Sequence, residues 1–354
     1  MLAGGVGAAR FLRGLLRVTD PRSVVVIGNT ADDEEFFGLH VAPDLDTLTY
    51  TLAELAEPRR GWGIAGDTFA CLEALDRFYH ESWFRLGDRD LATHIYRTDR
   101  LRAGDPLSRI TRAIGSKLGV LTRIIPMTDD PVRTFVHTKR GRRPFQTYLV
   151  RDGSRGRVQR VEFRGVMQAK PAPGVLAALR AASFLIIPPS NPIVSIGPIL
   201  AVRGVRKQIR DGRAPVVAIS PLIGGRPVKG PADRILRGLG IEPSPVGVAR
   251  LYSDLVDLFV LDTQDAALAP RVAELGCAVL VADTLLDSPA RAARLAQCIL
   301  DELSTMKHRM PCGRASRRNT PVSRRSRGHD GARAAPRSSR RPPPKLHAVS
   351  PARS

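Results

Sequence analysis

The chain opens with Gly4-Gly5-Val6-Gly7-Ala8-Ala9-Arg10 and soon reaches the apolar run Ser23-Val24-Val25-Val26-Ile27-Gly28-Asn29-Thr30. The glycine loop follows only two apolar strand residues, Leu2-Ala3, and residues 10–16 behind it have apolar side chains at helical spacing. A continuous apolar run such as residues 23–30 is typical of a parallel strand that is buried on both faces. The order strand, loop, helix, strand predicts one half of a doubly wound sheet.

Further apolar runs in the second half of the chain predict the other half of this sheet. Residues 184–187 and 215–219 each end in a polar turn, and an amphipathic segment closes the pattern at 289–303. We therefore expect an α/β fold with a doubly wound, mostly parallel, Rossmann-like sheet. Ligands of such sheets bind outside the carboxyl ends of the strands, so the turns after residues 2, 29, 187 and 219 should converge. Two further strands are expected, at residues 258–261 and 278–281.

The middle of the chain has shorter and less regular patterns. They predict a smaller added α/β subdomain, inserted roughly at residues 100–170 of a domain that spans 1–303. The expected strands of the middle region are 120–126, 133–138 and 146–151, and the expected helices before it are 47–58 and 68–80.

The composition is that of a globular protein, because 43% apolar residues are enough to bury a core. No apolar run reaches the roughly 18 residues that a membrane-spanning helix needs, and the first residues lack a secretory signal. We therefore expect a cytoplasmic protein with no membrane partner. The cysteines show no metal-ligand spacing, so we expect buried thiols rather than disulfides or a zinc site. They are Cys71, Cys277, Cys298 and Cys312.

The net charge of +21 is unevenly distributed. Residues 304–354 carry 14 Lys and Arg against the single acid Asp330, a charge of +13, which leaves +8 for residues 1–303. This tail is rich in Arg, Ser and Pro and has almost no apolar periodicity, so we expect it to be disordered. No aromatic residues alternate with its arginines, and we expect no specific nucleic-acid partner.

Acidic residues follow the first apolar run. Asp44 and Asp46 are separated by one residue, so in an extended segment both carboxylates would face one side and hold a hard cation, with Asp32 or Asp33 as a further ligand. Magnesium is the natural ion, because a phosphate ligand supplies the remaining oxygens. The alternative is a helix cap by Asp46 or Thr47, which would explain one aspartate but not four.

Two other segments carry polar groups that suit phosphate chemistry. Residues 86–94 place Arg89 between two acids and His94 one helical turn after the second. This pattern fits phosphate neutralisation by Arg89 with orientation or proton transfer by His94, or else a surface ion-pair network. Residues 189–198 contain three prolines that fix a turn presenting Ser190, Asn191 and Ser195, as a ligand turn or a helix cap. A similar polar turn begins at Ser220, and Lys229 follows it.

These segments, in this order, resemble the 2-phospho-L-lactate transferase family of coenzyme F-420 biosynthesis. The matching motifs cover nearly all of residues 1–303. They are GGVGAARFL (4–12), PDLDT (43–47), GWGIAGDTF (61–69), LGDRDLATH (86–94), PSNPIVSIGPIL (189–200), ISPLIGG (219–225), VKGPAD (228–233), LGCAV (275–279) and ADTLL (282–286).

The resemblance implies Mg²⁺-dependent transfer of a 2-phospholactyl or phosphoenolpyruvyl group from a guanosine-diphosphate-linked donor. The acceptor would be the ribityl hydroxyl of 7,8-didemethyl-8-hydroxy-5-deazariboflavin, and GMP would leave. The family also suggests a homodimer. Expected roles are catalysis for Asp46, Arg89 and His94, and metal binding for Asp32, Asp44 and Asp46. Expected substrate-binding residues are Gly4, Gly5, Gly7, Arg10, Asp46, Thr47, Asp67, Asp88, Arg89, Ser190, Asn191, Ser195, Ser220 and Lys229.

One alternative is a nucleotide-sugar-binding regulatory protein without catalysis, since a related group has the same glycine-rich opening and Ser-Asn-Pro turn. We prefer the enzyme because residues 43–47 and 87–94 supply metal ligands and a basic contact that a sensor does not need. A nucleic-acid-binding protein would depend entirely on residues 304–354.

Overall fold

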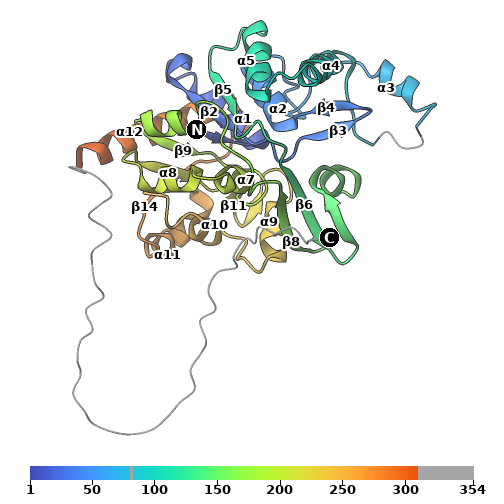
Figure 1. Cartoon of the computed structure of the whole chain (residues 1–354). Helices are drawn as coiled ribbons and strands as arrows, with labels where there is room; N and C mark the ends of the chain where they lie inside the picture. The colour runs from blue at the N-terminus through green and yellow to red at the C-terminus, as the bar shows by residue number, and fades with distance from the viewer. Residues whose placement is uncertain (80–82, 310–354) are drawn as a thin grey trace, which may run out of the picture.

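Two parallel sheets form the centre of the protein, for which a computed structural model describes residues 1–79 and 83–309 (Figure 1). In the first sheet β1 and β5 flank β2, and in the second the order is β9-β10-β13-β14. The expected α/β class with parallel strands is confirmed. The strands are β1 (Leu2–Ala3), β2 (Val25–Gly28), β5 (Arg123–Pro126), β9 (Leu185–Ile187), β10 (Val216–Ile219), β13 (Leu258–Asp262) and β14 (Ala278–Ala282).

The two sheets make one layer, because β1 contacts β9 and both sheets share the same two apolar faces. Val26 and Val217 belong to the cluster on one face, whereas Ile27 and Val216 belong to the cluster on the other. Successive residues of a strand point to opposite faces, so both faces of the layer are buried. The strand order across the layer is β5-β2-β1-β9-β10-β13-β14. The chain adds strands outward from β1 on one side and outward from β9 on the other, so the topological switch point of this doubly wound sheet lies between β1 and β9.

Helices cover both faces of the layer (Figure 1). Helix α1 forms because Ala8, Phe11, Leu12 and Leu15 recur at helical spacing, and their buried stripe packs on the sheet and on α12. One group comprises α1 (Gly5–Leu15), α2 (Pro43–Leu52), α5 (Leu107–Lys117) and α12 (Pro289–Arg309). The other comprises α6 (Val175–Ala181), α7 (Ile196–Ala201), α8 (Val205–Asp211), α9 (Ala232–Gly238), α10 (Pro245–Leu251) and α11 (Ala269–Ala273).

Smaller elements stand beside this layer. An antiparallel sheet in the order β7-β6-β8 falls within the region where we expect the added subdomain, whose boundaries stay a prediction. A hairpin of β3 and β4 packs on helix α4, which also contacts α3. These elements are β3 (Glu34–Phe36), β4 (Leu39–Val41), α3 (Ala70–Leu75), α4 (Asp88–Arg102), β6 (Arg133–Thr138), β7 (Gly141–Pro144), β8 (Val158–Arg164), β11 (Leu222–Ile223) and β12 (Arg226–Pro227).

Some expected elements differ from the structure. The strand predicted at 146–151 is wrong, because residues Thr147–Arg151 form a π-helix. Phe145 and Tyr148 are buried three residues apart, which is a helical and not an alternating pattern. The helix predicted at 68–80 is shorter, and the one predicted at 47–58 begins earlier and ends at Leu52.

The C-terminal helix and the cysteines also differ from the expectations. Helix α12 continues past residue 303 to Arg309, and the remainder of the predicted disordered tail, with Cys312, lies outside the described residues. Cys71 and Cys298 are exposed free thiols and Cys277 is half-buried, so the expectation of buried thiols is wrong for these three. Within the described part of the chain, none of the helices is both long and apolar enough to span a bilayer.

The contact between α1 and α12 requires a glycine at position 14. A Cβ added there would lie 2.3 Å from the Ala292 carbonyl carbon, so Gly14→Ala forces the helices apart. We expect the substitution to lower the free energy of unfolding by about 1–3 kcal/mol, measured by urea denaturation. Gly115→Ala in α5 is the matched control, because its Cβ meets nothing nearer than 3.8 Å. It should be neutral or stabilising, and equal losses for both variants would contradict this view of the interface.

Candidate functional site

A cavity of about 560 Å³ opens where β1, β2, β9 and β10 end. The four turns that were expected to converge all contribute to its wall. Most of the predicted site residues line it as well, whereas Asp67, Asp88 and Arg89 do not. Those that line it are Gly4, Gly5, Gly7, Arg10, Asp32, Asp44, Asp46, Thr47, His94, Ser190, Asn191, Ser195, Ser220 and Lys229.

The glycine loop is held from both sides. The Gly5 amide donates to Asp44 Oδ1 at 2.7 Å, and the Ser190 hydroxyl donates to the Gly4 carbonyl at 2.8 Å. Gly5 has a φ of +73°, and a Cβ at Gly7 would lie 2.2 Å from the Pro189 carbonyl oxygen. The glycines are therefore required for the turn and for close approach of the turn after β9.

The start of α1 can bind an anion. The Gly5 amide is occupied by Asp44, but Val6 and Gly7 also belong to the first turn, where amides have no partner within the helix. The helix dipole favours negative charge at this end, and Arg10 adds a cation to the same wall of the cavity. This arrangement suits a phosphate group.

The polar turns after β9 and β10 are rigid. Asn191 Oδ1 accepts bonds from the amides of Ile193 at 3.0 Å and Val194 at 3.3 Å, and the Ser220 hydroxyl donates to the Leu222 carbonyl at 2.9 Å. These contacts form Asx-type and related turns, whereas Ser195, the cap residue of α7, makes no side-chain capping bond, so the helix-cap interpretation is wrong. The turns thus present a fixed surface at the switch point.

Asp32 and Asp44 form a pair of buried carboxylates on the cavity wall. Burial and the neighbouring Asp44 raise the pKa of Asp32 well above its usual value. Burial also raises the pKa of Asp44 to about 6, although bonds from Asn29 and Gly5 act in the opposite direction. In the described part of the chain, Asp32 Oδ1 has no hydrogen-bond partner. A cation between these groups would relieve their repulsion.

The structure does not gather a complete protein ligand set for a metal. Residues 1–79 and 83–309 contain no cluster of three His, Cys, Asp or Glu side chains suited to one. Two carboxylates nevertheless fit magnesium, which commonly binds one or two carboxylates together with substrate phosphates and water. Asp33, the other acid considered at this position, is paired through Oδ2 with His40 at 2.9 Å and, unlike Asp32, is not part of the cavity wall.

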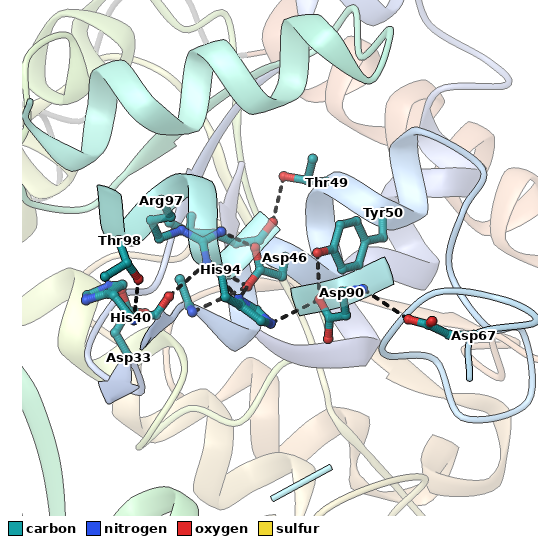
Figure 2. Close-up of polar contacts among 12 residues, drawn as sticks. Asp33, His40, Asp46, Thr49, Tyr50, Asp67, Asp90, His94, Arg97 and Thr98 are labelled. Carbon is teal, nitrogen blue, oxygen red and sulfur yellow. Dashed lines mark hydrogen bonds and ion pairs between the residues drawn. The ribbon is translucent and has the colours of Figure 1, made fainter. Parts of the chain in front are cut away.

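Asp46 is directed toward Arg97 (Figure 2), whereas Asp44 binds Gly5 and Asn29. Residues 44–46 lie in the first turn of α2 and not in an extended segment, so the geometry assumed for a shared cation is wrong. Both Asp46 oxygens bind the Arg97 guanidinium, at 3.1 Å from Nη1 to Oδ2 and through a second, shorter contact. The Ala42 amide also approaches Oδ2 at 3.3 Å, which is a capping contact.

His94 and Asp90 extend this buried network (Figure 2). His94 Nδ1 lies 3.2 Å from Arg97 Nη1 and 3.7 Å from Asp46 Oδ2, and Nε2 lies 3.1 Å from Asp90 Oδ1. The Tyr50 hydroxyl donates to the same Asp90 oxygen at 2.6 Å. Asp46, Tyr50, Asp90 and His94 line the cavity, so the network forms one of its walls.

Asp67, Asp88 and Arg89 have structural contacts instead. Asp67 accepts bonds from the Arg89 and Asp90 amides at 2.8 and 3.0 Å, and so caps α4. Asp88 accepts from the Ala70 and Cys71 amides and caps α3. The Arg89 side chain is exposed and donates to the Ala65 carbonyl at 3.3 Å. Within the described residues these contacts are mainly with backbone groups, so they do not form the surface ion-pair network considered for residues 86–94, and the phosphate role of Arg89 stays a prediction.

Aromatic and basic side chains form the remaining wall. Trp62, Trp83 and Phe84 line the cavity together with Arg85. Phe84 stacks on Phe36 at 3.9 Å between ring centres. Lys229 donates to the Arg60 carbonyl, and burial lowers its pKa, with a smaller contribution from Arg10. A flat ring could bind beside the aromatic groups and an anion beside the basic ones.

The sequence-based assignment missed Arg97, Asp90 and Tyr50. The spacing of Asp90, His94 and Arg97 places their three side chains on one face of a helix, and this spacing could have identified Asp90 and Arg97. Arg89 lies about 100° away from Asp90 on the same helix and therefore points elsewhere. Tyr50 has no comparable local signal, because its partner lies 40 positions away.

Several known proteins are similar to this chain. Residues 1–293 match the family described as 2-phospho-L-lactate transferase CofD. A phosphoenolpyruvate transferase of Streptomyces coelicolor is 46% identical over 86% of this chain and 98% of its own length. A 2-phospho-L-lactate transferase of Methanosarcina mazei is 39% identical over 85% and 98%. A UPF0052-family protein of Bacillus halodurans, 19% identical, aligns with a TM-score of 0.55 over 84% of this chain and 97% of its own, which supports the fold alone.

The Arg97–Asp46 pair should make a large contribution to stability. Arg97→Met leaves a buried carboxylate without its cation, and we expect the free energy of unfolding to fall by about 3–5 kcal/mol in urea denaturation. Arg89→Met is the matched control on the same helix, and its exposed side chain should contribute less than about 1 kcal/mol. Similar values for the two variants would show that the pair does not organise this wall.

Proposed function

The chain belongs to the 2-phospho-L-lactate transferase CofD family of coenzyme F-420 biosynthesis, and we propose that it transfers a phosphoenolpyruvyl group to a deazaflavin alcohol. The donor would be a guanosine-diphosphate-linked phosphoenolpyruvate, and GMP would be released. The acceptor would be the ribityl hydroxyl of 7,8-didemethyl-8-hydroxy-5-deazariboflavin. The binding-module alternative is set aside, because the chain belongs to an enzyme family.

One observation supports this function best. The anion-binding start of α1, the Asp32–Asp44 pair and the rigid turn after β9 meet in one cavity at the switch point of the sheet. A nucleotide diphosphate needs an amide-lined phosphate site and a counter-cation at the same place. We place the donor diphosphate at Val6 and Gly7 for this reason.

Magnesium fits the acidic pair. Asp32 and Asp44 would hold it, because they are buried close together and Asp32 has an oxygen without a partner in the described part of the chain. The ion would neutralise charge on the transferred phosphate. Asp46 was expected as a further ligand, but both its oxygens bind the Arg97 cation, so we assign it to positioning instead.

The acceptor would lie against the aromatic wall. Trp62, Trp83 and Phe84 offer ring faces and edges to a planar deazaflavin, and the wall formed by α4 continues from them. Phosphoryl transfer depends mainly on in-line positioning and charge neutralisation. The cavity supplies both, by fixing the donor on one side and the acceptor on the other.

The names of the relatives favour phosphoenolpyruvate over 2-phospholactate. The relatives named phosphoenolpyruvate transferase, from Streptomyces, Thermobifida and Kitasatospora, are 43–46% identical, against 35–39% for the Methanosarcina proteins named 2-phospho-L-lactate transferase. We also propose a cytoplasmic location and a homodimer, by analogy with the family.

A direct assay tests the function. Purified protein is incubated with the deazaflavin alcohol, Mg²⁺ and either the phosphoenolpyruvate-linked or the phospholactate-linked guanosine diphosphate, and GMP is followed by chromatography. We expect GMP release to require both substrates and to be faster with the phosphoenolpyruvate donor. Lack of release with both donors would refute the function, and faster release with phospholactate would refute the donor preference.

Removal of one carboxylate tests the magnesium assignment. Asp32→Asn weakens the attraction for the cation, so the Mg²⁺ concentration that gives half-maximal GMP release should rise about tenfold or more. Asp33→Asn is the matched control, because its carboxylate pairs with His40 and lies outside the cavity wall. An unchanged Mg²⁺ requirement for Asp32→Asn would remove this residue from the metal site.

A further inference from the structure

We propose that Asp90 accepts the proton of the attacking acceptor hydroxyl, and that Tyr50, His94 and Arg97 hold its carboxylate in place. This inference rests on the proposed transfer reaction and identifies the group that receives the proton. Asp90 lies in the first turn of α4 and lines the same cavity as the acidic pair and the aromatic side chains. Its side chain is 12% exposed, so it is mostly shielded from bulk water.

The position of Asp90 is determined on three sides. Asp67 accepts a bond from its backbone amide at 3.0 Å, which fixes the start of α4. The Tyr50 hydroxyl and His94 Nε2 both approach Oδ1, at 2.6 and 3.1 Å. In the described part of the chain, no donor is bonded to Oδ2. One oxygen is therefore held, and the other is available to a hydroxyl in the cavity.

Arg97 determines which nitrogen of His94 carries the proton. A guanidinium is always protonated and can only donate, so the 3.2 Å contact from Arg97 Nη1 makes His94 Nδ1 the acceptor. The proton of the neutral ring then lies on Nε2, which faces Asp90. Nδ1 is bound by Arg97, and Nε2 lies 3.1 Å from Asp90 Oδ1 without meeting hydrogen-bond geometry in the described part of the chain, so we assign His94 to positioning and the proton-transfer role considered for it to Asp90.

The other acids of the cavity are less suited to this step. Asp46 is bound through both oxygens by Arg97, and Asp44 accepts bonds from Gly5 and from Asn29 at 2.8 Å. Asp32 lies beside Asp44 on the side assigned to the cation. Asp90 lies on the α4 wall, where the acceptor would bind.

Asp90 is also ionised when the reaction begins. Burial alone would raise its pKa, but the contacts with His94, Tyr50 and Arg97 keep the pKa below its usual value. An aspartate of this kind orients the hydroxyl in the protein kinases and takes its proton as the bond to phosphorus forms. Asp90 does not need to be strongly basic, because the hydroxyl loses its proton late in the transfer step.

The step is balanced within the site. The hydroxyl oxygen of the acceptor forms a bond to the distal phosphorus, while the bond from that phosphorus to the bridging oxygen of GMP breaks. The electron pair leaves with GMP as a phosphate oxygen anion, and the hydroxyl proton moves to Asp90. No oxidant, reductant or further reactant takes part.

Asp90→Asn tests the inference in the full-length protein. The amide keeps the size of the side chain and an acceptor for Tyr50, but it cannot take a proton. We expect kcat for GMP release to fall by about 100- to 10,000-fold. Acceptor affinity, measured by quenching of deazaflavin fluorescence, should stay within about threefold of wild type. Asp99→Asn, an exposed acid on the same helix, should change neither value.

Chemical rescue separates proton transfer from a purely structural role. In Asp90→Ala, added formate can enter the space left by the carboxylate and should restore part of kcat, whereas chloride should not. Formate should have no such effect on Arg97→Lys. If Asp90→Asn does not fold, two other measurements decide the question. One is the formate rescue of Asp90→Ala, and the other is kcat of Tyr50→Phe, which should fall by about tenfold at unchanged acceptor affinity.

The outcomes distinguish this inference from the proposed function. If wild type releases GMP and Asp90→Asn retains kcat within about threefold, or Asp90→Ala is not rescued by formate, Asp90 is not the proton acceptor and the transferase function stands. If wild type releases no GMP with either donor, both proposals fail.

Discussion

The hydrogen bond from the Gly5 amide to Asp44 joins the parts on which the site depends. It connects the turn after β1, the start of α1 and the first turn of α2, and Asn29 at the end of β2 binds the other Asp44 oxygen. Ser190 completes the arrangement by tying the turn after β9 to Gly4. These hydrogen bonds therefore fix the turns at the switch point of the sheet relative to one another. They hold an amide-lined anion site and a buried carboxylate side by side.

The opposite wall depends on a second buried interaction, between Arg97 and Asp46. Neither charge could stay buried alone, so the pair locks α4 against α2. The same guanidinium sets the tautomer of His94, and His94 with Tyr50 orients Asp90. The contacts that fix helix α4 therefore also hold the Asp90 carboxylate at the surface of the cavity.

Much of this could be predicted from local patterns. Continuous apolar runs identified β2, β9, β10, β13 and β14, and the polar turns that follow the strands correctly indicated where the cavity lies. The expectations differ from the observed contacts where partners are distant in sequence. Arg89 was preferred to Arg97, because adjacency to acids is visible in a sequence whereas burial is not. Asp44 and Asp46 were treated as equivalent, yet helix α2 directs them to Gly5 and to Arg97.

We infer that a nucleoside diphosphate and its cation meet at the start of α1, beside Asp32 and Asp44. A crystal structure of the protein with GDP and Mn²⁺, with anomalous scattering used to locate the metal, tests it directly. We expect diphosphate oxygens on the Val6 and Gly7 amides and an anomalous peak at the carboxylates of Asp32 and Asp44. A well-ordered diphosphate bound away from α1, or a metal on other residues while Asp32 and Asp44 stay unliganded, would contradict it.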